Sequence, residues 1–335
     1  MEVPSISILL PFYQAEEVLP GAVDSILRQT CQDWELLLID NNSSDNGVEV
    51  AMAYGRKDKR IKVLHEPRQG IAYALNTGLK HAKAPIIARM DADDFSLPER
   101  LEKQYAFLVQ NPSVDVVSCC CDFHSELSES NGYQCYVQWQ NSILFPYDHA
   151  RNFFAESPLA HPSVMFRMAL VERYGVYATE AVPEDYELWL RWHVNGVRFE
   201  KLQETLLVWN DHRSRLSRNH DNYTDEAFDL VRIKYLSAWL KKHINPERKV
   251  VVCGTGKRPR ARAGLLLKAG VPIYAFTDLK QKSQCGAIFL PPSDITVKDN
   301  YFIISFISKR GVGESIRKFL TGKGLSELDD FVIAG

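Results

Sequence analysis

The sequence has no apolar run approaching the roughly 18 residues that a membrane-spanning helix needs. Its N-terminus also lacks the basic stretch and cleavage site of a secretory signal. Neither sign of charge is in excess, since 40 lysines and arginines stand against 42 aspartates and glutamates. A globally basic nucleic-acid-binding surface and an acidic solvating tail are therefore not indicated. We expect a cytoplasmic protein without a transmembrane segment or a nucleic-acid partner.

The seven cysteines form no CxxC pair and no histidine–cysteine cluster at zinc spacing, although three are consecutive at Cys119–Cys121. A disulfide framework or a zinc knuckle is therefore unsupported, and reduced thiols in a cytosolic compartment fit the pattern. Internal repeats and low-complexity tracts are also absent. The 335 residues, 45% of them hydrophobic, predict about two packed domains.

The first part of the chain alternates apolar segments with helical patterns. Apolar residues recur at helical spacing in residues 18–27, and Ser96 with Glu99 has the form of a capping box that predicts a helix start. A β-α-β-α rhythm with near-continuous apolar strands predicts a mostly parallel sheet with helices on both faces. The predicted strands are 6–10, 34–40, 61–66, 85–91 and 114–121.

The rhythm changes after residue 124, where longer irregular stretches contain a predicted helix at 183–194 and a strand at 205–209. A polar, helix-prone segment then leads to a second α/β rhythm with apolar strands at 249–256, 272–276 and 301–306. We therefore expect the following plan: a first α/β domain over 1–220, a helical linker over 221–245 and a smaller α/β domain over 246–335.

Two predicted strands end in carboxylates. One ends at Asp40, and another ends at Asp91, which is followed by Asp93 and Asp94. The carboxyl ends of parallel strands lie at one edge of a sheet, where ligands bind in open α/β folds. Neighbouring carboxylates suit Mg²⁺ or Mn²⁺, which usually also binds substrate phosphates, so the pattern indicates a diphosphate partner. The alternative is a solvated acidic turn that caps a helix at Leu97.

Three ordered segments carry a family resemblance: ISILLPFYQAEEVLPGAVDSILRQTCQDWELLLIDNNSSD, EPRQGIAYALNTGLKHA and IIARMDADDFSLPERLEKQ. They resemble the family-2 glycosyltransferases (GT2) with a GT-A fold, and the resemblance covers residues 5–215. It implies a nucleotide half over 1–123 and an acceptor half over 124–220. It also implies that Asp40 contacts the nucleotide base, and that Asp91 and Asp93 form the metal-binding D-x-D motif.

The resemblance also implies a lining for the nucleotide pocket. This lining is Pro11, Phe12, Tyr13, Asp40, Arg68, Gly70 and Asp91. The sequence departs mildly from the family where Asn41-Asn42 replaces a frequent Asp-Gly pair.

The segment PEDYELWLR at 183–191 resembles the family's E-D motif, in which the aspartate is the catalytic base of inverting members. This assigns the base to Asp185 and places Glu184, Trp189 and His161 on the acceptor side. The alternative is an ordinary helix start, because acidic residues are favoured in a first turn, and a lone histidine such as His161 is more often structural.

A basic cluster follows the strand at 205–209. It resembles the family segment that closes over the diphosphate, and Arg213 is its donor-binding candidate, since arginine binds phosphate through two parallel hydrogen bonds. A solvated basic loop is the alternative. The cluster is His212, Arg213, Arg215, Arg218 and His220.

The second α/β rhythm resembles Rossmann-like modules attached to some glycosyltransferases. Gly254-Thr255-Gly256 follows a strand, and Asp278 follows the next one, close to the spacing of a dinucleotide fingerprint. Pro259 replaces the third glycine, however, and the turn is basic, with Lys257, Arg258, Arg260 and Arg262. An NAD(P)-dependent oxidoreductase thus remains an alternative, and the turn could instead hold a phosphate or serve assembly or acceptor docking.

The sequence and the resemblance together predict a metal-dependent inverting glycosyltransferase that uses Mn²⁺ or Mg²⁺ and a nucleotide-sugar donor, a UDP-sugar. The expected acceptor is a glycan or lipid-linked glycan in polysaccharide or glycolipid synthesis. A lipid-linked acceptor would bring the protein to the inner face of the membrane. A non-catalytic sugar-nucleotide binding protein is the other alternative. A sugar-nucleotide pyrophosphorylase fits less well, because no Gly-rich loop with adjoining Arg and Lys lies near the N-terminus.

Overall fold

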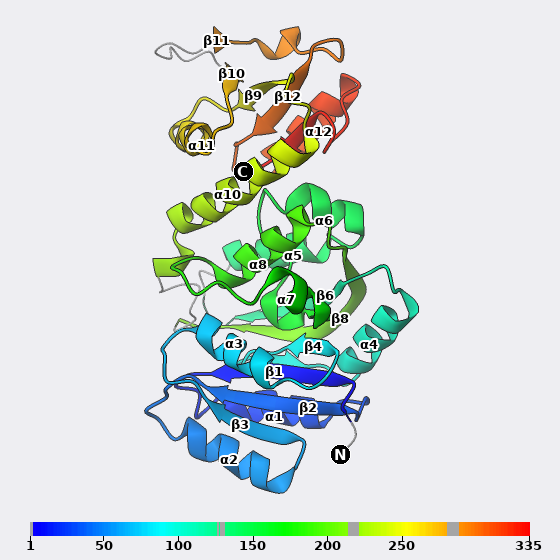
Figure 1. The fold of residues 1–335 in the computed structure, drawn as a ribbon, viewed down its shortest axis with the longest axis vertical. Helices are drawn as coiled ribbons and strands as arrows, with labels where there is room; N and C mark the ends of the chain where they lie inside the picture. The colour runs from blue at the N-terminus through cyan, green and yellow to red at the C-terminus, as the bar shows by residue number, and fades with distance from the viewer. Residues whose placement is uncertain (1–2, 126, 128–130, 214–220, 280–287) are drawn as a thin grey trace. The chain divides into compact units, whose positions relative to one another are not determined.

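The computed structural model describes residues 3–125, 127, 131–213, 221–279 and 288–335. It divides into two compact units (Figure 1). The first unit contains Met1–His149, Pro158–Leu188 and Asn195–Tyr223, and the second contains Ala150–Ser157, Trp189–Val194 and Thr224–Gly335. Each unit has its own sheet and its own hydrophobic core.

The first unit is built on an eight-stranded sheet in the order β3-β2-β1-β4-β7-β6-β8-β5. The first four strands in this order, β3-β2-β1-β4, are parallel to one another, while β7 pairs antiparallel with both β4 and β6. The mostly parallel sheet predicted from the apolar strands is therefore confirmed. The strands are β1 (Ile6–Phe12), β2 (Trp34–Asp40), β3 (Ile61–His65), β4 (Ile86–Arg89), β5 (Phe95–Ser96), β6 (Val116–Ser125), β7 (Met165–Arg167) and β8 (Phe199–Asp211).

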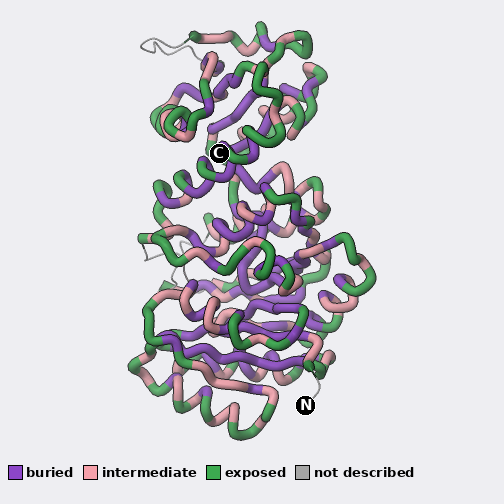
Figure 2. Tube along the Cα trace, in the orientation of Figure 1, coloured by how far each residue is buried: buried purple, intermediate pink, exposed green. Residues whose placement is uncertain are grey.

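Helices cover this sheet, and every residue of the strands β1 and β2 is buried. Helix α3 packs on β1 and β2, whereas α4 packs on β6 and β8. Figure 2 shows the strands as largely buried segments between more exposed helices. The helices are α1 (Leu19–Leu27), α2 (Gly47–Lys57), α3 (Ile71–His81), α4 (Arg100–Gln110), α5 (Asn131–Asn141), α6 (Pro146–Asn152), α7 (Ala169–Tyr174) and α8 (Glu184–Val194).

The predicted capping box at Ser96 is wrong. Ser96 belongs to strand β5, where it pairs with Leu207 of β8, and helix α4 begins only at Arg100. The side chain of Ser96 accepts a hydrogen bond from Gln29 Nε2 at 3.1 Å instead of capping a helix. Although the local pattern at Ser96 favours a helix start, its pairing with a strand distant in the sequence places it in the sheet instead.

The second unit contains a five-stranded, fully parallel sheet in the order β11-β10-β9-β12-β13. Helix α10 (Asp225–His243) lies in this unit and is capped by the side chain of Thr224. The strands are β9 (Lys249–Cys253), β10 (Ile273–Thr277), β11 (Ile288–Phe289), β12 (Tyr301–Ser305) and β13 (Phe331–Ile333), and the other helices are α11 (Lys257–Lys268) and α12 (Val312–Gly322).

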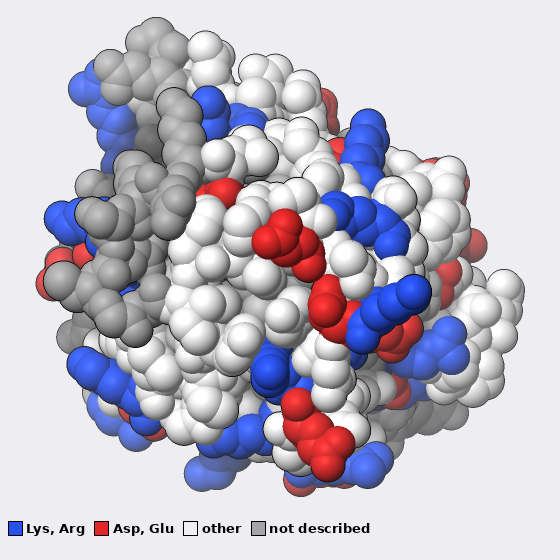
Figure 3. Space-filling view, turned by 90° about the horizontal axis from the view of Figure 1, so that it is seen from above, with Lys and Arg blue, Asp and Glu red and all other residues white. Residues whose placement is uncertain are grey.

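Two surface properties can be compared with the sequence. Among the described residues, no helix is both long and apolar enough to cross a lipid bilayer. On the face drawn in Figure 3, the described lysines and arginines lie among aspartates and glutamates instead of forming a patch of one sign. This mixing agrees with the nearly neutral net charge of −2.

Candidate active site

Asp40 is the last residue of β2, and its side chain is almost fully buried, with 3% exposed. Its carboxylate is held from two sides. The backbone N–H of Ser43 donates to Oδ1 at 3.0 Å, and Nδ1 of His65 lies 2.7 Å from Oδ2. Asp40 and His65 also line a cleft of about 550 Å³ beside α2. A carboxylate fixed in this way is oriented before any ligand arrives.

The loop that contains Arg68 and Gly70 is fastened to the end of β2 by Asn41. The side chain of Asn41 donates to the carbonyl of Arg68 at 2.7 Å and accepts from the N–H of Gly70 at 2.8 Å. An aspartate could accept but could not donate, so asparagine suits this position. Asn42 has φ of 64°, a conformation that glycine or asparagine adopts readily, which accounts for the second departure from the family's Asp-Gly pair.

Arg68 is itself oriented by Glu66. Its guanidinium forms two hydrogen bonds with the buried Glu66 carboxylate, at 2.8 and 3.0 Å, and stacks 4.6 Å from the ring centre of Tyr73. The hydrogen bond from Arg68, with help from Thr77, lowers the pKa of Glu66 to about 2. Arg68 nevertheless stays exposed, with 65% of its side chain accessible, so it can reach a ligand while remaining anchored.

The segment after β1 has one exposed and two buried members. Pro11 and Phe12 are buried in β1, whereas Tyr13 is 51% exposed. Gln14, which the sequence did not single out, has φ of 50° and accepts from the backbone N–H groups of Ser44 and Asp45 at 2.9 and 3.1 Å. These bonds tie the loops after β1 and β2 together, and no local pattern in the sequence indicates them.

The aspartates after β4 converge. One oxygen from each of Asp91, Asp93 and Asp94 lies within 4.8 Å of the others, and this is the metal-capable group found among the described residues. Three carboxylates offer the hard oxygen ligands that Mg²⁺ and Mn²⁺ prefer, and the arrangement leaves positions for phosphate oxygens. The residues therefore fit such an ion.

Each of these aspartates has a fixed neighbour. The buried Arg89 pairs with Asp91, Nε2 of His212 lies 2.6 Å from Asp93 Oδ2, and the backbone N–H of Asn210 donates to Asp94 at 2.9 Å. His212 and Asn210 come from the end of β8, because β8 pairs with β5 just after the acidic motif. Arg213 is exposed next to His212, while Arg215, Arg218 and His220 lie outside the described residues.

Glu184 and Asp185 form the first turn of α8. Glu184 is buried, with 4% exposed, and Asp185 is partly exposed. The hydroxyl of Tyr223 donates to Glu184 Oε2 at 2.6 Å, and Nδ1 of His161 lies 3.8 Å from Oε1. His161 Nε2 in turn lies 2.9 Å from the hydroxyl of Tyr177. Both tyrosines were missed from the sequence, because their partners are distant along the chain.

Burial raises the pKa of both acidic residues of this turn. For Glu184 the neighbouring charge of Asp185 raises the pKa further, and for Asp185 the charge of Asp91 does so. A position in the first turn of a helix favours the ionised form of Asp185, but burial outweighs this effect and its pKa is raised. Burial together with the charge of Arg89 holds the pKa of His161 well below its usual range, so this histidine is neutral near pH 7.

Trp189, expected on the acceptor side, is completely buried and packs against Trp192 with 5.3 Å between ring centres. Both tryptophans lie in the second unit. The other acceptor-side residues, Glu184 and His161, lie together in the first unit with Asp185.

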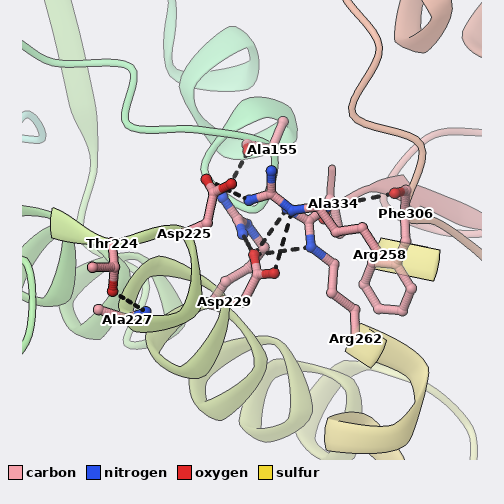
Figure 4. Close-up of polar contacts among 10 residues, drawn as sticks. Ala155, Thr224, Asp225, Ala227, Asp229, Arg258, Arg262, Phe306 and Ala334 are labelled. Carbon is pink, nitrogen blue, oxygen red and sulfur yellow. Dashed lines mark hydrogen bonds and ion pairs between the residues drawn. The ribbon is translucent and has the colours of Figure 1, made fainter. Parts of the chain in front are cut away.

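The basic turn of the second unit uses its charges internally (Figure 4). Arg258 donates to Asp225 at 2.8 Å, and Arg262 donates to Asp229 at 2.9 Å. Arg232 also pairs with Asp229. Two of the four cations that could have bound a phosphate are therefore neutralised by carboxylates of helix α10.

The glycine turn of this unit is similarly occupied by its own chain. A Cβ on Gly254 would meet Pro259 and Ile307 at 3.0 Å, and both the N–H and the hydroxyl of Thr255 donate to Asp278 at 2.8 Å. Because Gly254 has no side chain, Pro259 can pack closely against its backbone. Pro259 is the residue that replaces the third glycine of the fingerprint, so the space beside Gly254 is filled by the chain itself. These contacts give the oxidoreductase alternative no support.

The geometry of the first unit can be compared with known proteins. Residues 7–175 match the model of Glycosyl transferase family 2. The chain is 30% identical over 234 residues to the "Putative glycosyltransferase EpsE" of Bacillus subtilis, and the matched region covers 68% of this chain and 81% of that protein. It is 31% identical over 223 residues to the "O-antigen biosynthesis glycosyltransferase WbnJ" of Escherichia coli, covering 64% of this chain and 82% of that one.

Among solved structures, S. aureus TarS (residues 1–349, in complex with UDP-GlcNAc) superimposes with a TM-score of 0.54. The match covers 70% of this chain and 72% of that one, at 17% sequence identity. At this identity the likeness concerns the fold.

Proposed function

This chain belongs to glycosyltransferase family 2, and on that premise we propose that it is a metal-dependent inverting enzyme that transfers a sugar from a UDP-sugar to an acceptor hydroxyl. The observation that carries the proposal is the pairing of two acidic groups in one unit. The convergent Asp91, Asp93 and Asp94 offer a metal site, and Asp185 is a carboxylate whose pKa is raised by burial and by the charge of Asp91.

The two groups divide the chemistry. Asp185 removes the proton from the acceptor hydroxyl while the acceptor oxygen forms its bond to the anomeric carbon, and the bond from that carbon to the diphosphate breaks. Displacement from the face opposite the leaving group inverts the anomeric centre. Asp93 and Asp91 would hold a divalent ion, which would supply positive charge for the departing diphosphate. Arg89 keeps Asp91 oriented, and His212 contacts Asp93.

The donor is held at the neighbouring strand ends. Asp40 accepts from the nucleotide base, and Arg68 and Gly70 line the base pocket through the loop that Asn41 fastens. Tyr13 and Arg213 are exposed and complete the donor side, together with the buried Pro11 and Phe12. A relative from Escherichia coli that is 28% identical over 209 residues is named "UDP-Gal:alpha-D-GlcNAc-diphosphoundecaprenol beta-1,3-galactosyltransferase", and this name supports a UDP-sugar as donor.

The acceptor lies on the side of Glu184 and His161, next to Asp185. The O-antigen biosynthesis named for WbnJ supports a polysaccharide as the final product, and the GlcNAc-diphosphoundecaprenol in the name of the same Escherichia coli galactosyltransferase supports a lipid-linked precursor as acceptor. A lipid-linked precursor would bring the enzyme to the inner face of the membrane. The domain plan that goes with this proposal assigns transfer to the first unit and an accessory role to the second.

A panel of UDP- and GDP-sugars tests the proposal. Release of the nucleoside diphosphate is measured with Mn²⁺, with a chelator, and after Mn²⁺ is restored, and the anomeric configuration of the product is read by NMR. We expect turnover of at least one UDP-sugar that stops with the chelator and returns with Mn²⁺, and a product of inverted configuration. Metal-independent turnover or a retained configuration would contradict the mechanism.

A further inference from the structure

Asn210, the next to last residue of β8, faces the acidic motif that follows β4. Strands β5 and β8 pair antiparallel, with Phe95 opposite Val208. Extending this register by two residues places Asn210 opposite Asp93. The two residues are 117 positions apart in the sequence, so it is the pairing of the strands that brings them together.

Asn210 donates two hydrogen bonds to the motif. Its side-chain Nδ2 donates to the carbonyl oxygen of Asp93 at 2.7 Å, and its backbone N–H donates to Oδ1 of Asp94 at 2.9 Å. Asp94 is 2% exposed, so its carboxylate is held in the protein interior. One residue of β8 therefore fastens both the main chain at Asp93 and the side chain of Asp94.

The bond to the Asp93 carbonyl affects where the neighbouring carboxylates point. A peptide unit is planar, so fixing this oxygen fixes the plane that joins Asp93 to Asp94. The orientation of the plane sets a backbone angle of each aspartate, and the side chains turn with it. Nε2 of His212 also lies 2.6 Å from Asp93 Oδ2. That contact holds the carboxylate, whereas Asn210 holds the backbone from which the carboxylate extends.

The chemistry of this contact favours asparagine at position 210. An aspartate would present an acceptor to the Asp93 carbonyl in place of a donor, and a leucine would fill a similar space with neither. Residues that orient the ligands of a metal ion influence how tightly the ion binds. Their loss typically lowers the metal affinity by about 10–100-fold.

We propose that Asn210 is a positioning residue for the divalent ion, an inference that rests on the metal-dependent function proposed above. One oxygen from each of Asp91, Asp93 and Asp94 lies within 4.8 Å of the others. The amide of Asn210 acts through Asp93 by keeping its carboxylate in this group. The backbone N–H of the same residue keeps Asp94 fastened to β8.

The test is the affinity for Mn²⁺ alone. Mn²⁺ is titrated into the full-length protein without nucleotide, and the signal of free Mn²⁺ is followed by electron paramagnetic resonance. Asn210→Leu removes the amide and retains bulk, Asn210→Ala removes both, and either variant keeps the backbone N–H that binds Asp94. We expect the Mn²⁺ affinity to fall by about 10–100-fold in both variants. Thermal unfolding shows whether each variant is folded during the titration.

Asn111→Leu is the matched control. Asn111 Nδ2 also donates to a backbone carbonyl, that of Phe107 at 2.9 Å, but it follows the C-terminal end of α4. The acidic motif precedes the N-terminal end of the same helix. We expect Asn111→Leu to bind Mn²⁺ within about threefold of the wild type, a difference of less than 1 kcal/mol.

Four outcomes would overturn the inference. Unchanged Mn²⁺ affinity in the two Asn210 variants would refute the role of Asn210 and leave the metal site intact. An equal fall in Asn111→Leu would show a general effect of losing such a bond. Unfolding of both Asn210 variants at the titration temperature would mean that Asn210 supports the whole fold and not the ion. Absence of Mn²⁺ binding by the wild type, with or without UDP, would refute this inference and the metal-dependent function together.

Discussion

Asp185 lies beside Glu184 in the first turn of α8, and its proposed role as catalytic base has a direct consequence for activity. Asp185→Asn keeps the shape of the side chain but cannot take the proton from the hydroxyl of the sugar acceptor. We therefore expect turnover to fall by about 10²–10⁴-fold while UDP binding persists. Steady-state kinetics and calorimetry check this together. Asp329→Asn, at an exposed aspartate of the second unit, is the control, and near-normal turnover in Asp185→Asn would remove this residue from the role of base.

The raised pKa of Asp185 also predicts a pH dependence of stability. A carboxyl with a folded-state pKa above its unfolded value is ionised at a cost to folding once the pH exceeds the unfolded pKa, and the cost vanishes below that value. Asp185→Asn removes this cost. If about 1 kcal/mol is recovered, the unfolding midpoint rises by about 2–4 °C at pH 7.5.

The same measurement at low pH completes this prediction. Near pH 3.5 the wild-type carboxyl is protonated in the folded state and mostly protonated in the unfolded state, so the gain in midpoint from Asp185→Asn should largely disappear. Thermal scans at the two pH values, with Asp329→Asn beside them, test the sign. A variant less stable than the wild type at pH 7.5 would show that the carboxylate contributes to folding and not only to catalysis.

At the scale of single residues, the sequence predicted the side chains that belong to ordered motifs. Asp91 and Asp93 follow a strand at the expected edge, and they converge with Asp94 in the structure. It could not predict Tyr223 or His65, because their partners Glu184 and Asp40 are supplied by tertiary contacts and strand register. Neither residue carries a local pattern that marks it.

At the scale of elements, the loop before α3 depends on a single backbone conformation. Gly70 has φ of 132°, which side-chain-bearing residues rarely adopt, and an added Cβ would lie 3.3 Å from the ring of Tyr73. Gly70→Ala should therefore destabilise the protein by about 1–3 kcal/mol and weaken UDP binding, because Arg68 shares the loop. Chemical unfolding and calorimetry measure the two effects.

A second glycine provides a control of opposite sign. Gly55 lies inside helix α2, and a Cβ there would meet its nearest neighbours at 3.6 Å. Gly55→Ala should be neutral or stabilising by up to about 1 kcal/mol, since alanine favours a helix interior. Equal destabilisation by the two substitutions would refute the argument from backbone conformation at Gly70.

Elements with strong periodicity were predicted well, and the short ones were not. The strand at 34–40 matches β2, and the helix at 183–194 matches α8 within one residue. The two-residue strand β5 was missed, since its pairing with β8 overrides a local pattern that favours a helix start. An alternation of apolar and polar residues can be recognised only over several positions, and β5 has two residues.

At the scale of the whole molecule, the second unit draws on two segments of the first 220 residues. Phe154 packs against Trp239 of α10 with 5.7 Å between ring centres, and Phe153 stacks on His193 at 4.8 Å. A chain ending at Tyr223 would lose α10 and expose Phe154 to water. We expect this truncated chain to be insoluble or to unfold at a lower temperature than the full chain.

Expression, light scattering and thermal unfolding of residues 1–223 beside the full chain test this expectation. A soluble truncated chain with the midpoint of the full-length protein would mean that the two segments do not need the rest of their unit. The sequence could not anticipate this interleaving, because residues 150–157 and 189–194 carry no pattern that separates them from their neighbours.

The most direct test of the central claim is calorimetry of UDP binding with and without Mn²⁺, for the wild type and for Asp93→Ala. The account predicts tight binding only when both the metal and Asp93 are present. UDP binding that is equally tight without Mn²⁺, or unchanged in Asp93→Ala, would contradict a metal-dependent donor site at the carboxyl end of β4.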